Sequence, residues 1–242
     1  MASAGRGTVG ATEIRALASG GFKAAYLALV PGFESATGHK VLTAWGSSVA
    51  GAPSSIPNRL QDGEAVDLVI MASHGLDRLI GEGSIAAGSR IDLARSGIGV
   101  AVRAGAPRPD ISSADALIRA LRQAKSVARS SSASGIYLEG LFRRLGLADA
   151  LGDRIRQIEG EPVGSVVARG EAEIGFQQVS ELLPVPGIDY LGPLPPEIQH
   201  TTVFAAGIAA AAREPAAARA LIAHLTAPAA AAIIRQCGME PA

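Results

Sequence analysis

Serine-bearing segments of small residues follow four apolar runs of the chain. They are Ser19-Gly20-Gly21, Gly46-Ser47-Ser48, Ala72-Ser73-His74-Gly75 and Ser130-Ser131-Ser132-Ala133-Ser134-Gly135. Each segment lies where a strand would end and a helix would begin. Serine hydroxyls and the free N–H groups of a first helical turn donate hydrogen bonds, and the helix dipole favours negative charge there. Four such segments around one cleft would bind an anion without a metal. The pattern therefore predicts a receptor for a small anionic solute, or an enzyme built on such a receptor.

Ionisable side chains next to three of these segments add acid–base chemistry. His74 lies within the third segment, Lys23 follows the first and Arg129 precedes the fourth. An imidazole titrates near neutral pH, and a guanidinium binds a carboxylate through two parallel hydrogen bonds. If the protein is an enzyme, we expect His74 to be the general base and Lys23 and Arg129 to hold carboxylates. Otherwise His74 caps a helix or lies at the surface, and the two cations are solvated.

Composition excludes several other classes of function. The 22 basic and 22 acidic residues cancel, and no basic stretch with interleaved aromatics predicts a nucleic-acid surface. Cys237 is the only cysteine, so neither an intramolecular disulfide nor a cysteine-based zinc site is possible. Four scattered histidines predict no metal site, and we expect no cofactor because phosphate-loop and dinucleotide motifs are missing. Gly46-x-Ser48-x-Ala50 is not followed by an acid and a histidine at suitable strand ends for a serine hydrolase.

No apolar run reaches the roughly 18 residues of a membrane span. Residues 1–12 lack the charged and apolar regions of a secretory leader. The sequence is compatible with a cytoplasmic protein, or with a periplasmic one whose leader has been removed.

Short β-branched runs alternate with helical patterns along the 242 residues, which predicts an α/β fold with a mainly parallel sheet and helices on both faces. The expected strands are 14–19, 41–46, 66–72, 98–103, 126–128, 155–158, 172–177, 188–191 and 202–210. The expected helices are 22–37, with a kink or break at Pro31, and 55–62, 75–81, 112–124, 134–145, 163–169, 179–183, 215–225 and 227–236. These elements put the four serine-bearing segments at strand ends.

An ordered set of segments resembles the molybdate-binding proteins of ABC importers over about residues 12–242. The set is Ala18-Ser19, Gly38-His39-Lys40-Val41, Gly46-Ser47-Ser48, 66–70, 89–95, Ser134-Gly135-Ile136-Tyr137, 170–176 and Gly238-Met239-Glu240-Pro241. The resemblance implies a type 2 periplasmic-binding fold, in which two α/β lobes are joined by two crossing strands with a ligand cleft between them. Lobe 1 would comprise 1–94 plus 204–242 and lobe 2 would comprise 95–203, with 98–103 and 202–210 as the crossing strands. Ligand would favour the closed state, which in an importer would dock on a membrane permease.

The resemblance also assigns site residues. Ser19 and Ser47 match the family's two ligand-binding serines, and Ser134 and Val163 match residues that bind through backbone amides. Gln178 stands where the family has a tyrosine, and residues 49–56 form a longer loop than the family's. The same loops add further expected ligand-binding residues, namely Gly20, Ser48, Ser73, Arg129, Ser132 and Gly135. The departures and the extra ionisable groups favour a carboxylate ligand over molybdate.

One catalytic branch, aconitate isomerase, is similar to the same receptors. It moves a double bond in a tricarboxylate without a cofactor, so a proton must leave one carbon and return to another. This alternative would use His74 as the base and Lys23 and Arg129 as cationic partners of the substrate. A receptor for a small carboxylate or oxyanion, an isomerase of cis- and trans-aconitate or a related acid, and a cytoplasmic anion sensor therefore all stay open.

Overall fold

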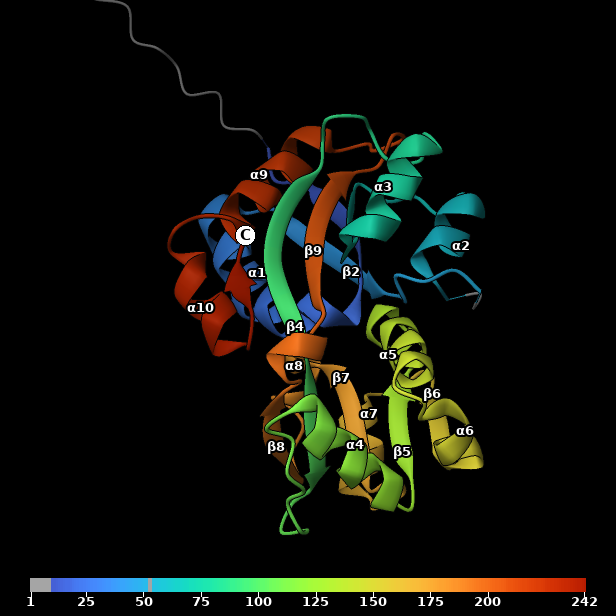
Figure 1. Ribbon diagram of the computed structural model, residues 1–242. Coiled ribbons are helices and arrows are strands. Elements are labelled where there is room, and N and C mark those ends of the chain that lie inside the picture. The colour runs from blue at the N-terminus through green and yellow to red at the C-terminus, as the bar shows by residue number, and fades with distance from the viewer. Residues whose placement is uncertain (1–9, 52–53) are drawn as a thin grey trace, which may run out of the picture.

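Strand β4 (Ile91–Arg103) belongs to two sheets in turn. The computed structural model describes residues 10–51 and 54–242. Up to Gly97, β4 pairs antiparallel with β9 (Thr201–Ile208), and from Ile98 it pairs antiparallel with β7 (Ile174–Gln178) and β8 (Ile188–Pro193). Figure 1 shows β4 running between two stacked lobes. The predicted strand 98–103 is therefore only the second half of a longer crossing strand.

Lobe 1 contains the first half of β4 and the strands β1 (Glu13–Ala18), β2 (Lys40–Trp45), β3 (Leu68–Ala72), β9 and β10 (Glu240–Pro241), in the sheet order β2-β1-β3-β9-β4. The side chains of β3 alternate between two cores, because Leu68 and Ile70 face one cluster while Val69 and Met71 face the other. The first cluster is covered by α1 (Lys23–Thr37), α9 (Pro215–Leu225) and α10 (Ala230–Gln236), and the second by α2 (Ile56–Gln61) and α3 (Ser73–Gly81).

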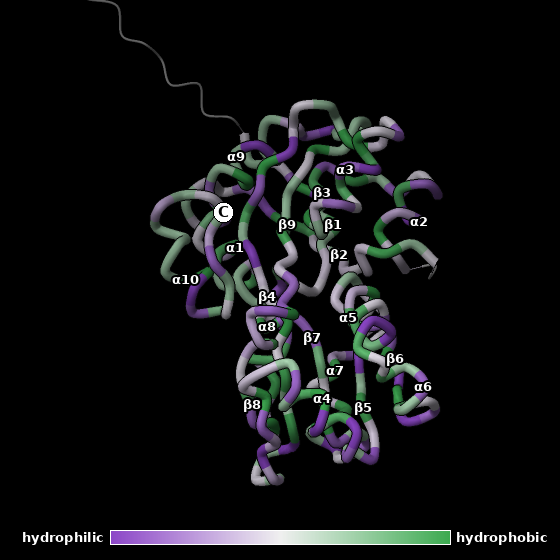
Figure 2. The backbone as a smooth tube through the Cα atoms, viewed as in Figure 1, coloured by the Kyte–Doolittle hydropathy of each residue, from purple (hydrophilic) through white to green (hydrophobic). Residues whose placement is uncertain are grey.

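Lobe 2 contains the second half of β4, then β7, β5 (Val127–Ser130) and β6 (Ile155–Ile158) in sheet order, with β8 also paired to β4. Its helices are α4 (Ala114–Gln123), α5 (Ala133–Arg144), α6 (Ala148–Leu151), α7 (Val163–Ala168) and α8 (Val179–Leu182). In Figure 1, α5 and α8 lie at the end of lobe 2 that faces lobe 1. The outer helices alternate hydrophilic and hydrophobic stretches, as expected for helices with one buried face (Figure 2).

The expected α/β fold is confirmed, but the expectation of a mainly parallel sheet is wrong. Among the described residues, β1 pairs in parallel with β2 and β3, and β5 with β6 and β7, whereas every pairing of β4 and β9 is antiparallel. The antiparallel pairs arise because the chain crosses between the lobes along β4 and returns into lobe 1 along β9. Helix α1 also continues through the exposed Pro31 to Thr37, so of the predicted kink or break the break is wrong, and the kink stays a prediction.

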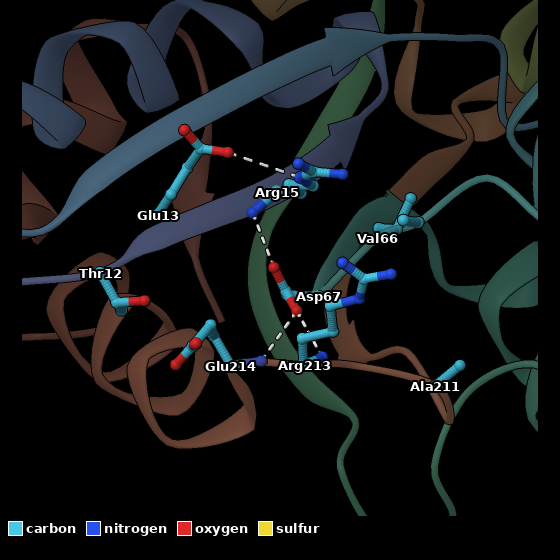
Figure 3. Close-up of a pocket in the computed structure, with 9 residues that line it drawn as sticks. Thr12, Glu13, Arg15, Val66, Asp67, Ala211, Arg213 and Glu214 are labelled. Atoms are coloured by element: carbon cyan, nitrogen blue, oxygen red, sulfur yellow. Dashed lines mark hydrogen bonds and ion pairs between the residues drawn. The ribbon is translucent and has the colours of Figure 1, made fainter.

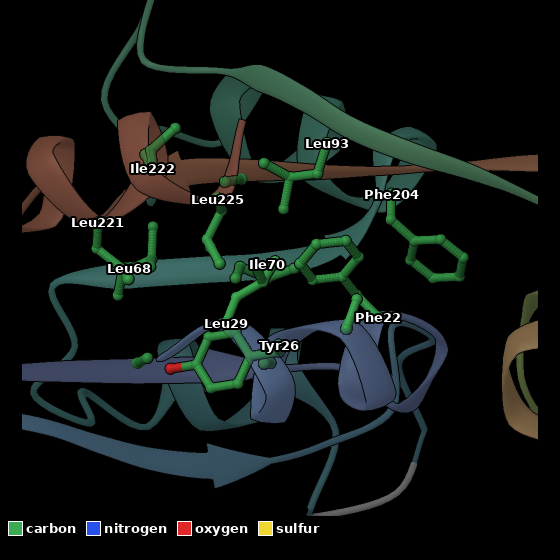
Figure 4. Close-up of a cluster of buried hydrophobic side chains, with 14 of the residues drawn as sticks. Phe22, Tyr26, Leu29, Leu68, Ile70, Leu93, Phe204, Leu221, Ile222 and Leu225 are labelled. Atoms are coloured by element: carbon green, nitrogen blue, oxygen red, sulfur yellow. The ribbon is translucent and has the colours of Figure 1, made fainter. Parts of the chain in front are cut away.

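The core of lobe 1 fixes where the first serine-bearing segment lies. Phe22 and Tyr26 of α1 and its preceding turn pack among aliphatic side chains of β3 and α9 (Figure 4). The Tyr26 hydroxyl is hydrogen-bonded to Thr43 Oγ1 at 2.7 Å, and burial raises the pKa of Tyr26 to about 12. A Cβ on Gly21 would lie 2.0 Å from the Phe204 ring, so any larger residue would require that ring to move. This packing holds the turn after β1 against β9, where the lobes meet.

No single helix in the described ranges is long and apolar enough to cross a membrane. The pair α9 and α10 reaches that length and apolarity only when taken together, and the two helices are bent by 67°.

Candidate functional site

Ser19 is the most informative side chain of the first segment. Its backbone N–H donates to the Ile70 carbonyl at 2.8 Å, which fixes it at the end of β1. The residue is only 4% exposed, and its Oγ is the one buried side-chain polar atom of the described residues that has no hydrogen-bond partner. A buried hydroxyl without a partner costs about 1–3 kcal/mol. Ser19 Oγ is therefore ready to bond an incoming polar ligand.

The second and third segments lie beside the first. The Gly46 N–H donates to the Ala18 carbonyl at 3.0 Å, and Ser48 Oγ accepts the Ala72 N–H at 3.1 Å. Ser47 Oγ accepts the N–H of Val49 at 3.1 Å and stays half-buried. A Cβ on Gly75 would lie 3.1 Å from the Ser48 carbonyl oxygen. The carboxyl ends of β1, β2 and β3 thus bring together the predicted residues of lobe 1, which are Ser19, Gly20, Ser47, Ser48 and Ser73.

The two ionisable residues predicted in lobe 1 lie at the outside of this edge. Lys23 is exposed, and its Nζ lies 4.9 Å from the ring centroid of Trp45, the residue before Gly46. The cation is therefore close to the second segment. His74 is exposed in the first turn of α3. Its role as a base stays a prediction.

In the fourth segment, three serine hydroxyls form a cluster at the start of α5. Ser130 Oγ lies 2.9 Å from Ser132 Oγ and 3.0 Å from Ser134 Oγ. A Cβ on Gly135 would lie 1.6 Å from the Ser130 carbonyl oxygen, so glycine lets the helix close onto the end of β5. Ser130, which the sequence analysis did not select, is the centre of this cluster.

Arg129 is already engaged within lobe 2. Its Nη2 lies 3.2 Å from a carboxylate oxygen of Glu139, and its Nη1 donates to the carbonyls of Ser130 and Gly135 at 3.4 Å. The side chain is 11% exposed. The guanidinium thus ties β5 to α5, and binding a ligand carboxylate would require it to leave these partners.

Two predicted residues bond to other parts of the protein. The Val163 N–H, expected to bind the anion, donates to Gln177 Oε1 at 2.8 Å. The buried Gln178 amide lies at the crossing between lobes. Oriented to satisfy its neighbours, its nitrogen donates to the Ser96 carbonyl at 3.0 Å and its oxygen accepts from Thr202 Oγ1 at 2.8 Å. Gln178 thus joins β7 to both crossing strands, and its role toward a ligand stays a prediction.

Helix α8 of lobe 2 brings a carboxyl to the Ser19 segment that the sequence analysis missed. Ser180 Oγ donates to the Gly21 carbonyl at 2.7 Å across the lobe boundary. The half-buried Glu181 places Oε1 2.6 Å from the position of a Cβ on Gly20. Burial raises the pKa of Glu181 to about 7, and a hydrogen bond with Gln177 opposes this shift. The available signal was the pair of polar residues Ser180 and Glu181 shortly after the buried strand β7.

A separate pocket lies at the opposite edge of lobe 1 and is structural. It is lined by Arg15, Asp67 and Arg213 among others (Figure 3). The buried Asp67 carboxylate accepts the backbone N–H groups of Arg15, Arg213 and Glu214 at 2.8, 2.8 and 3.0 Å. It therefore anchors the entries of β1 and α9. Within the described part of the chain, no three His, Cys, Asp or Glu side chains are grouped to hold a metal ion.

Comparisons with known proteins agree with this two-lobed arrangement. Residues 14–240 match the family model of bacterial extracellular solute-binding proteins. An aconitate isomerase from Pseudomonas sp. is 45% identical over 231 residues, covering 95% of this chain and 88% of that protein. The structure is similar to the periplasmic molybdate-binding protein of Azotobacter vinelandii, with a TM-score of 0.76, 23% identity and coverage of 93% and 98% of the two chains. It is also similar to a sulfate-binding protein of Mycobacterium tuberculosis, with a TM-score of 0.76, 19% identity and coverage of 95% and 87%.

The resemblance inferred from the ordered segments is thus confirmed, as is the two-lobed periplasmic-binding fold. The match to the family model spans nearly all of the sequence. The chain belongs to the family of bacterial extracellular solute-binding proteins.

Proposed function

We propose that the protein binds a small anion between its lobes and that a carboxylate is the favoured class. The observation that carries this proposal is the buried Ser19 hydroxyl without a partner at the lobe boundary. Serine hydroxyls of both lobes and the nearby Lys23 cation supply neutral and charged donors, which suits an anion. The molybdate- and sulfate-binding proteins with the same fold bind oxyanions, according to their names.

The expected lobes, 1–94 plus 204–242 and 95–203, are part of this proposal. The change of strand partners along β4 at Gly97 and Ile98 supports a boundary near this point. Ligand contacts from both lobes would stabilise the closed state, because only that state offers both sets of donors. In an importer the closed form would dock on an ABC permease.

A second candidate is a cofactor-independent isomerase of cis- and trans-aconitate or a related unsaturated polycarboxylate. Two observations favour it: the 45% identity to an aconitate isomerase over nearly the whole chain, and a carboxyl with a pKa of about 7 beside the Ser19 segment. The reaction removes a proton from the methylene carbon, shifts the double bond and returns a proton to the former vinyl carbon, so no redox partner is needed. Glu181 is better enclosed for this transfer than the exposed His74.

The deciding experiment incubates the protein with cis- or trans-aconitate in heavy water and follows the proton spectrum. Thermal unfolding with molybdate, sulfate, citrate and trans-aconitate runs alongside. Interconversion with deuterium uptake would establish the isomerase. A raised Tm with one class of anion and no interconversion would establish the receptor. No thermal shift and no interconversion would refute both candidates.

A further inference from the structure

Glu181 is the one acidic side chain of α8, and it lies against the segment that carries the unpartnered Ser19 hydroxyl. Its Oε1 lies 2.6 Å from the position of a Cβ on Gly20, the residue after Ser19. The Ser180 bond to the Gly21 carbonyl, 2.7 Å long, fixes α8 in this place. The Glu181 carboxyl therefore lies against the segment through which Ser19 would bind an anion.

Hydrogen bonding orients Glu181 toward this position. The Gln177 amide accepts the Val163 N–H through Oε1, at 2.8 Å, which leaves its nitrogen to donate to the Glu181 carboxyl. Glu181 is thus held by a neutral amide and not by a cation. A chain of bonds from Val163 through Gln177 to Glu181 occupies the region where the family resemblance predicts a backbone donor to the anion.

The charged neighbours of Glu181 are few. Helix α8 packs against α1, α7, β4, β7 and the turn of residues 20–22, and its two ends also lie against Gly238. The titratable groups of that last segment are Cys237 and the ion pair of Arg235 with Glu240. The turn and α7 contain no ionisable side chain, and the last two residues of β7 are neutral amides. The near end of α1 contributes Lys23, whose ammonium lies over Trp45, and β4 contributes the exposed Arg95 near Ser96, the partner of Ser180. Burial is the largest cause of the raised pKa of Glu181, and no charged group is among its causes.

We propose that Glu181 is a ligand-binding residue that meets the anion as a neutral carboxylic acid, so that each anion bound between the lobes is accompanied by one proton. Lys23 lies over Trp45 and does not act on the Glu181 carboxyl, so two carboxylates in contact at Glu181 cannot both stay ionised. The protonated one donates a short, strong O–H···O⁻ bond. This inference rests on the proposed anion-binding function. The protonated Glu181 carboxyl would be a hydrogen-bond donor that favours a basic carboxylate ligand over a weakly basic oxyanion such as sulfate.

The coupling predicts how affinity depends on pH. Below the pKa of free Glu181, the proton is already present and binding is independent of pH. Above it, each binding event must take up a proton, so affinity falls toward tenfold per pH unit. At pH 8.5, which is 1.5 units above a pKa of about 7, the loss reaches roughly 30-fold.

The test measures affinity and proton uptake for trans-aconitate and for sulfate between pH 7.5 and 8.5, where both anions are fully ionised. Fluorescence of Trp45, the single tryptophan, reports binding beside Lys23. Calorimetry in two buffers of different ionisation enthalpy counts the protons. We expect the wild type to take up nearly one proton with trans-aconitate at pH 8.5, and Glu181→Gln to take up none and to bind independently of pH. The exposed Glu82→Gln serves as a matched control that keeps the wild-type profile.

Each result tests whether anion binding is coupled to protonation of Glu181. Binding without proton uptake in the wild type, or equal uptake in Glu181→Gln, would overturn it while leaving the anion-binding function intact. Failure of both anions to bind at any pH would refute the proposed function and the coupling with it. If Glu181→Gln does not fold, the proton count of the wild type and the profile of Glu181→Asp decide the question.

Discussion

Gly135 and Gly140 lie on the same helix, α5, and respond in opposite directions to replacement by alanine. The Cβ of Gly135→Ala would lie 1.6 Å from the Ser130 carbonyl oxygen, whereas real Cβ atoms keep at least about 3.0 Å, so backbone must move by roughly 1.4 Å. At Gly140 the nearest atom is the flexible tip of Arg144 at 3.4 Å. Gly135→Ala therefore pushes a side-chain atom into the backbone of β5, whereas Gly140→Ala only replaces glycine by a good helix former.

We expect Gly135→Ala to lower the free energy of unfolding by about 3 kcal/mol, the upper part of the range for overpacked sites. Gly140→Ala should raise it by about 0.5–1 kcal/mol, because alanine loses less backbone entropy in a helix. Moving α5 away from β5 also separates Ser134 Oγ from Ser130 Oγ, now 3.0 Å apart. Loss of one such donor should weaken anion binding about tenfold in Gly135→Ala alone, or roughly 1.4 kcal/mol.

Urea denaturation of both variants measures stability, and titration of Trp45 fluorescence with trans-aconitate and sulfate measures affinity. Equal stability of Gly135→Ala and Gly140→Ala would refute the assigned contact. A destabilised Gly135→Ala with wild-type affinity would keep the contact and remove the serine cluster from the anion site.

Three further predictions follow from single side chains. Ser19→Ala should raise the free energy of unfolding by about 1–3 kcal/mol, since it removes a buried hydroxyl that has no partner, yet weaken anion binding about tenfold. The cap variant Ser113→Ala, which loses a bond to the Ala116 N–H, should lower the free energy of unfolding by about 1 kcal/mol and leave anion affinity unchanged. Unchanged affinity in Ser19→Ala would remove it from the site. For Glu181, the folded pKa of about 7 exceeds the usual 4.5, so the contribution of its neutral carboxyl to stability is fully present below pH 4.5 and is lost as pH rises to 7. In urea denaturation, Glu181→Gln should therefore be more stable than wild type at pH 8, by up to about 3 kcal/mol, and equally stable near pH 4.5. A difference in stability that does not change with pH would contradict this. Asp67→Ala should lower the free energy of unfolding by at least about 2 kcal/mol, because three backbone N–H groups lose their acceptor, and should leave anion affinity unchanged. A decrease below about 0.5 kcal/mol would show that water replaces the carboxylate as their acceptor.

Much of the architecture could be predicted because its signals are local. Alternating apolar runs marked the strands, and the small serine-bearing segments marked where strands end and helices begin. The first half of β4 escaped prediction because Asp92 and Arg95 interrupt its apolar pattern while Leu93 and Ala94 are buried. A β-bulge between Asp92 and Ala94 also breaks the alternation of side chains, and pairing with β9, 104 to 115 positions later in the chain, leaves no local trace.

The site was predicted only in part, for the same reason. Arg129 appeared free in the sequence, but Glu139 and the carbonyls of Ser130 and Gly135 hold it in the folded protein. Val163 appeared to offer a free N–H, but Gln177 accepts it. The roles of these residues toward a ligand stay predictions, since they depend on which internal bonds a ligand displaces.

By itself, the sequence determined the α/β class, the family resemblance and the serine-bearing strand ends, because all of these depend on residue types and spacings along the chain. Only the tertiary structure decided which polar groups are satisfied and which are not. It left Ser19 Oγ buried without a partner and brought Glu181, 162 positions later in the chain, against the neighbouring Gly20. Burial and contact across the lobe boundary set both properties, and they exist only when the two lobes are folded together.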